Sequence, residues 1–77
     1  MVDVDQLLDL TEHRCLAGYV LALTALGRLG PGLRLGLLLR DLREARWLAA
    51  RLDHLGYRVQ PPRPRERGAL VTVQPRG

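Results

Sequence analysis

Residues 7–41 read LLDLTEHRCLAGYVLALTALGRLGPGLRLGLLLRD, and this stretch decides the fold. The short run from Leu7 to Thr11 predicts a strand, and the strongly apolar segment from Leu16 to Leu29 predicts a helix. Gly30-Pro31-Gly32 predicts the end of that helix and a turn. Leu33 to Leu39 begins with alternation and ends as a continuous apolar run, which is typical of a central strand. The stretch therefore predicts a β-α-β unit.

A second helix is predicted downstream, from Leu42 to Leu55. Its apolar positions recur at spacings of three and four, Asp41 can cap its first turn, and Gly56 ends it. Two further strands are predicted to follow, at Tyr57 to Gln60 and at Ala69 to Gln74.

The segment Pro61 to Gly68 contains three prolines and three arginines, Arg63, Arg65 and Arg67. Because proline cannot donate to a sheet ladder, we expect a stiff, basic hairpin loop here. The element order is then β-α-β-α-β-β. It predicts an α/β two-layer sandwich, with two helices on one face of a four-stranded mixed sheet. Residues 1–77 form a single domain in this interpretation.

Composition narrows the function classes. One cysteine excludes an internal disulfide, and the absence of serine excludes a serine triad. Two histidines and one cysteine do not make a convincing zinc site, so we expect no metal and no cofactor. The acidic N-terminus is unlike a signal peptide, and the apolar stretch Leu16 to Leu26 is too short to span a bilayer. These features favour a cytoplasmic protein with no membrane partner.

The net charge of +4 is unevenly distributed. Residues 1–15 contain four acids and one arginine, and the rest of the chain contains eleven arginines and four acids. A basic body is typical of a protein with an anionic partner, either nucleic acid or an acidic protein face. Arginines scattered over a small, leucine-rich domain are more often simply a solvated surface.

Cys15 is the candidate reactive residue. It stands between the polar corner Glu12-His13-Arg14 and the first predicted helix. The helix macrodipole and the unpaired amides of a first turn favour a thiolate, which is the reactive form. Arg14 and His13 add positive charge beside it and are predicted to support the thiolate. The alternative is that Cys15 is a small buried hydrophobe.

Two helix surfaces carry predictions about contacts. The helix from Leu16 to Leu29 is apolar almost all round, which favours either a partner, such as a second copy in a homodimer, or cover from the second helix and nearby loops. Trp47 shares the outer face of the second helix with Arg43, Arg51 and His54. It is therefore either a docking anchor or a cation–π partner of these arginines.

The layout resembles the TusA/SirA sulfur-carrier family. The resemblance rests on Leu8-Asp9, on Arg14-Cys15 opening a helix, on Asp41 after the second strand, and on the order β-α-β-α-β-β across nearly the whole chain. It implies a two-layer sandwich similar to the C-terminal domain of translation initiation factor three. It also implies that Cys15 accepts a persulfide from a cysteine desulfurase or rhodanese-like donor. The sulfur would then pass to an acceptor protein, for example in tRNA thiolation.

The motif itself departs from the family pattern. Cys15-Leu16-Ala17-Gly18 stands where the family has Cys-Pro-x-Pro, and Arg40-Asp41-Leu42 stands where it has Asp-Asp-Pro. Glu12 adds a negative charge that would oppose a thiolate.

Three hypotheses follow from the sequence. The first is a sulfur carrier that docks its partners through Arg63, Arg65, Arg67 and Trp47. The second is a non-catalytic interaction or regulatory module in which Cys15 is structural. The third and weakest is direct nucleic-acid binding through the arginines, for which few aromatic residues are available.

Overall fold

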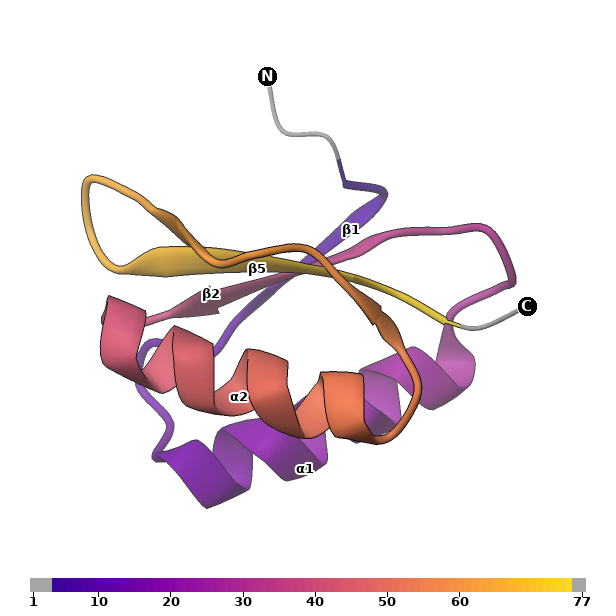
Figure 1. The fold of residues 1–77 in the computed structure, drawn as a ribbon, viewed down its shortest axis with the longest axis horizontal. Coiled ribbons are helices and arrows are strands. Elements are labelled where there is room, and N and C mark those ends of the chain that lie inside the picture. The colour runs from indigo at the N-terminus through magenta and orange to yellow at the C-terminus, as the bar shows by residue number, and fades with distance from the viewer. Residues whose placement is uncertain (1–3, 76–77) are drawn as a thin grey trace.

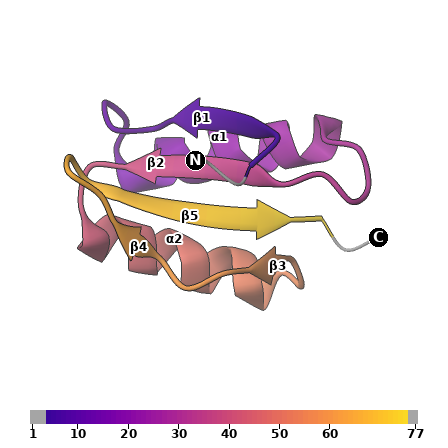
Figure 2. The same ribbon diagram turned by 90° about the horizontal axis from the view of Figure 1, so that it is seen from above.

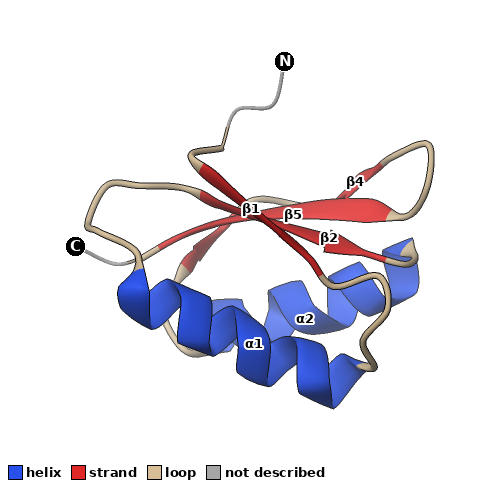
Figure 3. Ribbon diagram, turned by 180° about the vertical axis from the view of Figure 1, so that it is seen from behind, coloured by secondary structure: helices blue, strands red, loops and turns tan. Residues whose placement is uncertain are grey.

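A computed structural model describes residues 4–75 of the chain. In this part of the chain, two helices cover one face of a five-stranded sheet, and the opposite face of the sheet carries no helix (Figures 1 and 3). The elements are β1 (Gln6–Asp9), α1 (Cys15–Arg28), β2 (Leu35–Leu39), α2 (Leu42–His54), β3 (Arg58–Val59), β4 (Arg63–Pro64) and β5 (Ala69–Gln74). The predicted α/β two-layer sandwich and the position of both helices on one face are confirmed.

The sheet runs in the order β1-β2-β5-β3, and β4 pairs with β5 beside β3 (Figure 2). β1 is parallel to β2, in the register that sets Leu8 against Leu37. β5 is antiparallel to β2, β3 and β4. The sheet is therefore mixed, and β2 and β5 are its central strands. β1 is largely exposed at one edge.

The strand count and the proline-rich segment correct the sequence prediction. Residues 61–68 were expected to form a loop alone, but Arg63–Pro64 form the short edge strand β4, which pairs with Leu70 and Ala69. Proline is tolerated at a sheet edge because its missing N–H group faces away from the neighbouring strand. The basic hairpin is consequently shorter than predicted, and a bond from the Arg65 amide to the Gly68 carbonyl closes it at 2.8 Å.

The core lies between the sheet and the helices. Alternate residues of β2 point toward the helices, and those of β5 do the same. From the helix side, α1 contributes Ala22 and Leu26, and α2 contributes a stripe spaced by three and four residues. The largest fully buried side chains are Leu10, Leu35, Leu37, Leu48, Leu52, Val71 and Val73.

Asp41 caps α2 as the sequence predicts. Its carboxylate accepts a hydrogen bond of 2.8 Å from the backbone N–H of Glu44, which satisfies one of the orphan donors of the first turn. α1 is different, because Arg14 precedes it and no side chain caps its first turn. Within residues 4–75, neither helix has the length and apolar character needed to cross a membrane.

Replacing the cap is expected to cost stability. We expect Asp41→Ala to lower the free energy of unfolding by about 1 kcal/mol, because the Glu44 amide loses its acceptor. Urea denaturation followed by circular dichroism measures the change. Asp53→Ala is the control, since Asp53 lies exposed near the other end of the same helix. Equal losses in the two variants would contradict a specific capping role.

Candidate functional site

Cys15 is the first residue of α1, as predicted, and its side chain is partly exposed. The amides of the first turn are not capped by a side chain, and the first helical bond runs from the Gly18 amide to the Arg14 carbonyl at 2.8 Å. The thiol therefore stands at an open helix N-terminus. It is neither interior filler nor a mid-helix residue.

The thiol has a partner that the sequence analysis missed. The Cys15 thiol donates a hydrogen bond of 3.2 Å to Oε1 of Glu44, in the first turn of α2. The other carboxylate oxygen of Glu44 pairs with Nε of Arg40 at 3.0 Å. The Glu44 side chain is 16% exposed, and that of Arg40 is 50% exposed. The three side chains form a chain of contacts that joins the starts of both helices.

This arrangement favours the neutral thiol. The hydrogen bond to Glu44, followed by partial burial and the negative charge of Glu44, raises the pKa of Cys15. The Cys15 backbone amide and the Arg40 guanidinium act in the opposite direction but are outweighed. The Cys15 backbone amide favours the thiolate, and the Glu44 carboxylate outweighs it.

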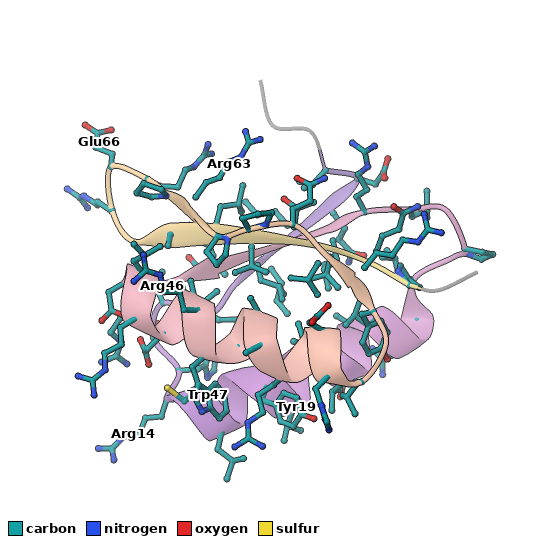
Figure 4. The ribbon with its side chains drawn as sticks, viewed as in Figure 1. Arg14, Tyr19, Arg46, Trp47, Arg63 and Glu66 are labelled. Atoms are coloured by element: carbon teal, nitrogen blue, oxygen red, sulfur yellow. The ribbon has the colours of Figure 1, made fainter. Side chains whose placement is uncertain are left out.

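The charges around the thiol also differ from the prediction. Arg14 and His13 were expected to support a thiolate, but the cation that acts on the sulfur is Arg40. Arg14 is exposed and its side chain extends away from the body of the fold (Figure 4). His13 is exposed, and its carbonyl accepts a bond of 3.4 Å from Arg40. The opposing acid is Glu44, where the sequence pointed to Glu12.

Asp9 shapes the corner that leads into α1. Its carboxylate accepts bonds from the hydroxyl of Thr11 at 2.6 Å and from the Thr11 amide at 2.9 Å. The hydroxyl bond, the amide bond and the nearby charge of His13 hold the pKa of Asp9 below its usual range. Both aspartates named from the family pattern therefore accept a backbone hydrogen bond near a helix start. Asp9 does so in the corner before α1, and Asp41 does so in the first turn of α2.

Trp47 is half-buried between the two helices. Its ring meets that of Tyr19 edge-on, with 6.1 Å between ring centroids, and both side chains lie on the side of the helices away from the sheet (Figure 4). The Arg51 guanidinium lies over Trp47 at 5.0 Å from the ring centroid. The cation–π interpretation is confirmed, and the covered ring is less suited to being a docking anchor.

The basic hairpin lies at the same end of the sheet as Cys15. Gly68 follows Arg67 and has a φ of 95°. A Cβ atom on Gly68 would stand 3.2 Å from the carbonyl oxygen of Arg40, the residue that pairs with Glu44. The hairpin is on the uncovered side of the sheet and the thiol is on the helix side, as the positions of Glu66 and Arg14 indicate (Figure 4). Arg63 also projects on the uncovered side (Figure 4).

Comparison with known proteins identifies no relative: no family model, no curated protein and no solved structure matches the chain. Among the described residues, no group of three or more His, Cys, Asp or Glu side chains could hold a metal ion.

Glu44 raises the pKa of the Cys15 thiol, so replacing its carboxylate gives a direct prediction. We expect Glu44→Gln to lower the pKa of Cys15, because the charged acceptor is lost while the amide and Arg40 remain. The rate of alkylation by iodoacetamide, measured against pH, should therefore rise at a lower pH than in the wild type. Asp53→Asn removes one negative charge from the same helix and is the control. An unchanged alkylation profile in Glu44→Gln would contradict the assignment.

Proposed function

We propose that the chain is a small sulfur carrier that accepts a persulfide on Cys15 and passes the sulfur to an acceptor protein. The observation that supports it is the contact between a partly exposed thiol at an open helix N-terminus and a carboxylate 3.2 Å away. A carboxylate at this distance can take the thiol proton as the sulfur attacks. The layout of the chain, which resembles that of the TusA/SirA family, supports the same function.

The transfer step balances without an added oxidant. The Cys15 sulfur attacks the outer sulfur of a protein persulfide, R–S–SH, on the donor. The donor S–S bond breaks, a new S–S bond forms on Cys15, and the thiol proton moves to Glu44. The donor thiolate then recovers a proton, so that R–S–SH and Cys15–SH become R–SH and Cys15–S–SH. In the second transfer, a thiol of the acceptor attacks the outer sulfur of Cys15–S–SH, the S–S bond on Cys15 breaks and a new S–S bond forms on the acceptor. The Cys15 thiolate recovers a proton from Glu44, so that Cys15–S–SH and the acceptor thiol become Cys15–SH and an acceptor persulfide.

Glu44 gives this carrier a protonated resting state. A thiol with a raised pKa is a poor nucleophile at neutral pH because little of it is ionised, although the thiolate that does form is intrinsically strong. Proton transfer to Glu44 within the contact removes this difficulty at the moment of attack. Without a docked donor persulfide, Cys15 stays protonated and reacts slowly with small alkylating agents.

Docking is the role that we assign to the arginines. Arg65 and Arg67 are exposed on the hairpin, and Arg63 is exposed on β4. Their position at the Cys15 end of the sheet suits an acidic surface on a donor or acceptor protein.

Mass spectrometry tests the proposal. The protein is incubated with a cysteine desulfurase and cysteine, or with a rhodanese and thiosulfate, and the Cys15 peptide is examined for one added sulfur atom. We expect the adduct in the wild type and none in Cys15→Ser. The absence of an adduct with both donor classes, or an adduct that persists in Cys15→Ser, would overturn the proposal.

A second candidate function is a non-catalytic interaction module in which Cys15 is structural. The observation that favours it is the same contact, because a thiol that donates to Glu44 links α1 to α2 and its pKa is raised. This function predicts no adduct with any donor and slow alkylation of Cys15 throughout the neutral range. The two functions are therefore separated by the mass-spectrometric experiment.

A further inference from the structure

The uncovered face of the sheet has an apolar groove beside the basic hairpin. Figure 2 looks onto this face, with both helices behind the sheet. Leu38 of β2 and Leu70 of β5 are direct partners in the register, and both lie on this face because their neighbours Leu37 and Val71 point into the core. Together with Leu7 of β1, which is 52% exposed, they line a groove of about 600 Å³.

The hairpin forms one wall of this groove and is positively charged. Pro64, Arg65, Glu66 and Arg67 complete the lining. Arg63 projects on the same side of the sheet (Figure 4). Among the described residues, the side chains of the three arginines form no hydrogen bond or ion pair. Their guanidinium groups can therefore pair with carboxylates of another molecule.

The acids near the groove do not cancel this charge. Glu66 is the acid in the lining, and it stands against three arginines on this side of the sheet. Asp9 lies opposite Leu38 in the register, but its carboxylate already accepts hydrogen bonds from the amide and the hydroxyl of Thr11. The groove thus combines an apolar floor with a positive wall. This combination is complementary to an acidic segment that also carries aliphatic side chains.

The aliphatic floor favours a protein segment over a single-stranded nucleic acid. Proteins that bind single strands stack the bases on aromatic side chains. The chain has three aromatic residues, one Trp and two Tyr, and none of them belongs to the groove. Tyr19 and Trp47 lie on the side of the helices away from the sheet (Figure 4), and Tyr57 packs against the core between the sheet and the helices.

We propose that this groove binds an acidic segment of a partner protein. Aliphatic side chains of the segment lie on Leu7, Leu38 and Leu70, and its carboxylates pair with the arginines of the hairpin. A groove of about 600 Å³ is within the size range of ligand pockets, so it admits a few side chains of a peptide. The inference builds on the docking role proposed above for the arginines, and it requires no chemistry at Cys15.

Fluorescence anisotropy with the full chain and a labelled synthetic peptide, Asp-Asp-Leu-Glu-Leu-Asp-Asp, tests the proposal. We expect binding in the micromolar range that weakens as the salt concentration rises. One comparison peptide has serine in place of leucine, and the other has Asn and Gln in place of the acids. Each should bind about tenfold more weakly, because each lacks either the apolar or the charged half of the contact.

Variants of the groove test its location. We expect Arg65→Glu/Arg67→Glu and Leu7→Ser each to weaken binding about tenfold. The matched controls are on the helix side of the fold: Arg43→Glu on α2, and Leu16→Ser at a leucine of α1 that is 70% exposed. Both controls should bind the peptide as the wild type does. Circular dichroism checks that each variant is folded, as expected because every substituted residue is exposed.

Several results would overturn the proposal. These are no binding by the wild type, or binding that both groove variants retain in full. Tighter binding of oligothymidine, lost in the same variants, would assign the groove to nucleic acid. Self-association of the protein alone that Leu7→Ser abolishes would assign the groove to a second copy. Cys15→Ser should bind the peptide as the wild type does, so the groove and the persulfide carrier can each fail without the other.

Discussion

Gly68→Ala is expected to lower the free energy of unfolding by about 2 kcal/mol or more. Gly68 has a φ of 95°, which costs an L-residue roughly 1–2 kcal/mol. A Cβ atom there would also collide with the backbone carbonyl oxygen of Leu39, at the end of β2. A carbonyl in a central strand cannot move without breaking the ladder to β5. The substitution therefore disturbs the hairpin and the end of the sheet that carries Arg40. Urea denaturation measures the loss.

Gly27→Ala provides the matched control for this prediction. A Cβ atom at Gly27 meets no atom within 4 Å, and the residue lies in the last turn of α1 with an ordinary helical backbone. Because alanine is the better helix former, this variant should be stabilised, by up to about 1 kcal/mol. The same chemical change is thus expected to have opposite signs at the two positions. Similar effects in both variants would show that the close approach of Gly68 to Leu39 does not constrain the fold.

The fold was predictable in the elements with long apolar patterns or with clear glycine and proline boundaries. The predicted helices agree with α1 and α2 to within one residue at each end, and the prediction for Ala69–Gln74 agrees with β5 in full. The edge strands were less predictable. β3 and β4 are two residues each, so they carry no periodicity. Arg63–Pro64 pairs because its neighbour β5 offers a free edge, which is a tertiary property that the local sequence does not contain.

The sequence predicted the position of the Cys15 thiol in the candidate site, but it did not predict that Glu44 is its hydrogen-bond partner. Cys15 was located by its place before an apolar helix. Glu44 is 29 residues away, and no local pattern links the two. A topological argument could have found it. When two successive helices cover the same face of a sheet and follow parallel strands, their N-termini lie at the same end, so residues of their first turns can meet. Asp41, the predicted cap, and Glu44 three residues later have the spacing that marks the first turn of a helix, so this pattern places Glu44 in the first turn of α2.

Leu37→Ala is the second large effect that we expect, with a loss of about 2–5 kcal/mol in the free energy of unfolding. Leu37 is fully buried on the helix-facing side of β2 and pairs with Leu8 on β1 and with Val71 on β5. Removing its methyl groups leaves a cavity at the centre of the core between the sheet and the helices, where the flanking strands cannot collapse. A domain of this size has a small free energy of unfolding, because a small chain buries only a modest share of its surface on folding. Much of the Leu37→Ala protein should be unfolded at 37 °C.

Leu33→Ala is the control for Leu37→Ala. It makes the same truncation four residues earlier, at a side chain that is 42% exposed, and should cost well under 1 kcal/mol. The comparison also concerns the site around Cys15. The buried side chains of Leu37 and Leu39 hold β2 in place, and Arg40, which pairs with Glu44, directly follows this strand. In Leu37→Ala the alkylation of Cys15 should follow the unfolded fraction and become fast as the Glu44 contact is lost. Alkylation that is no faster in the denatured protein than in the folded protein would show that Glu44 is not the group that raises the pKa of the thiol.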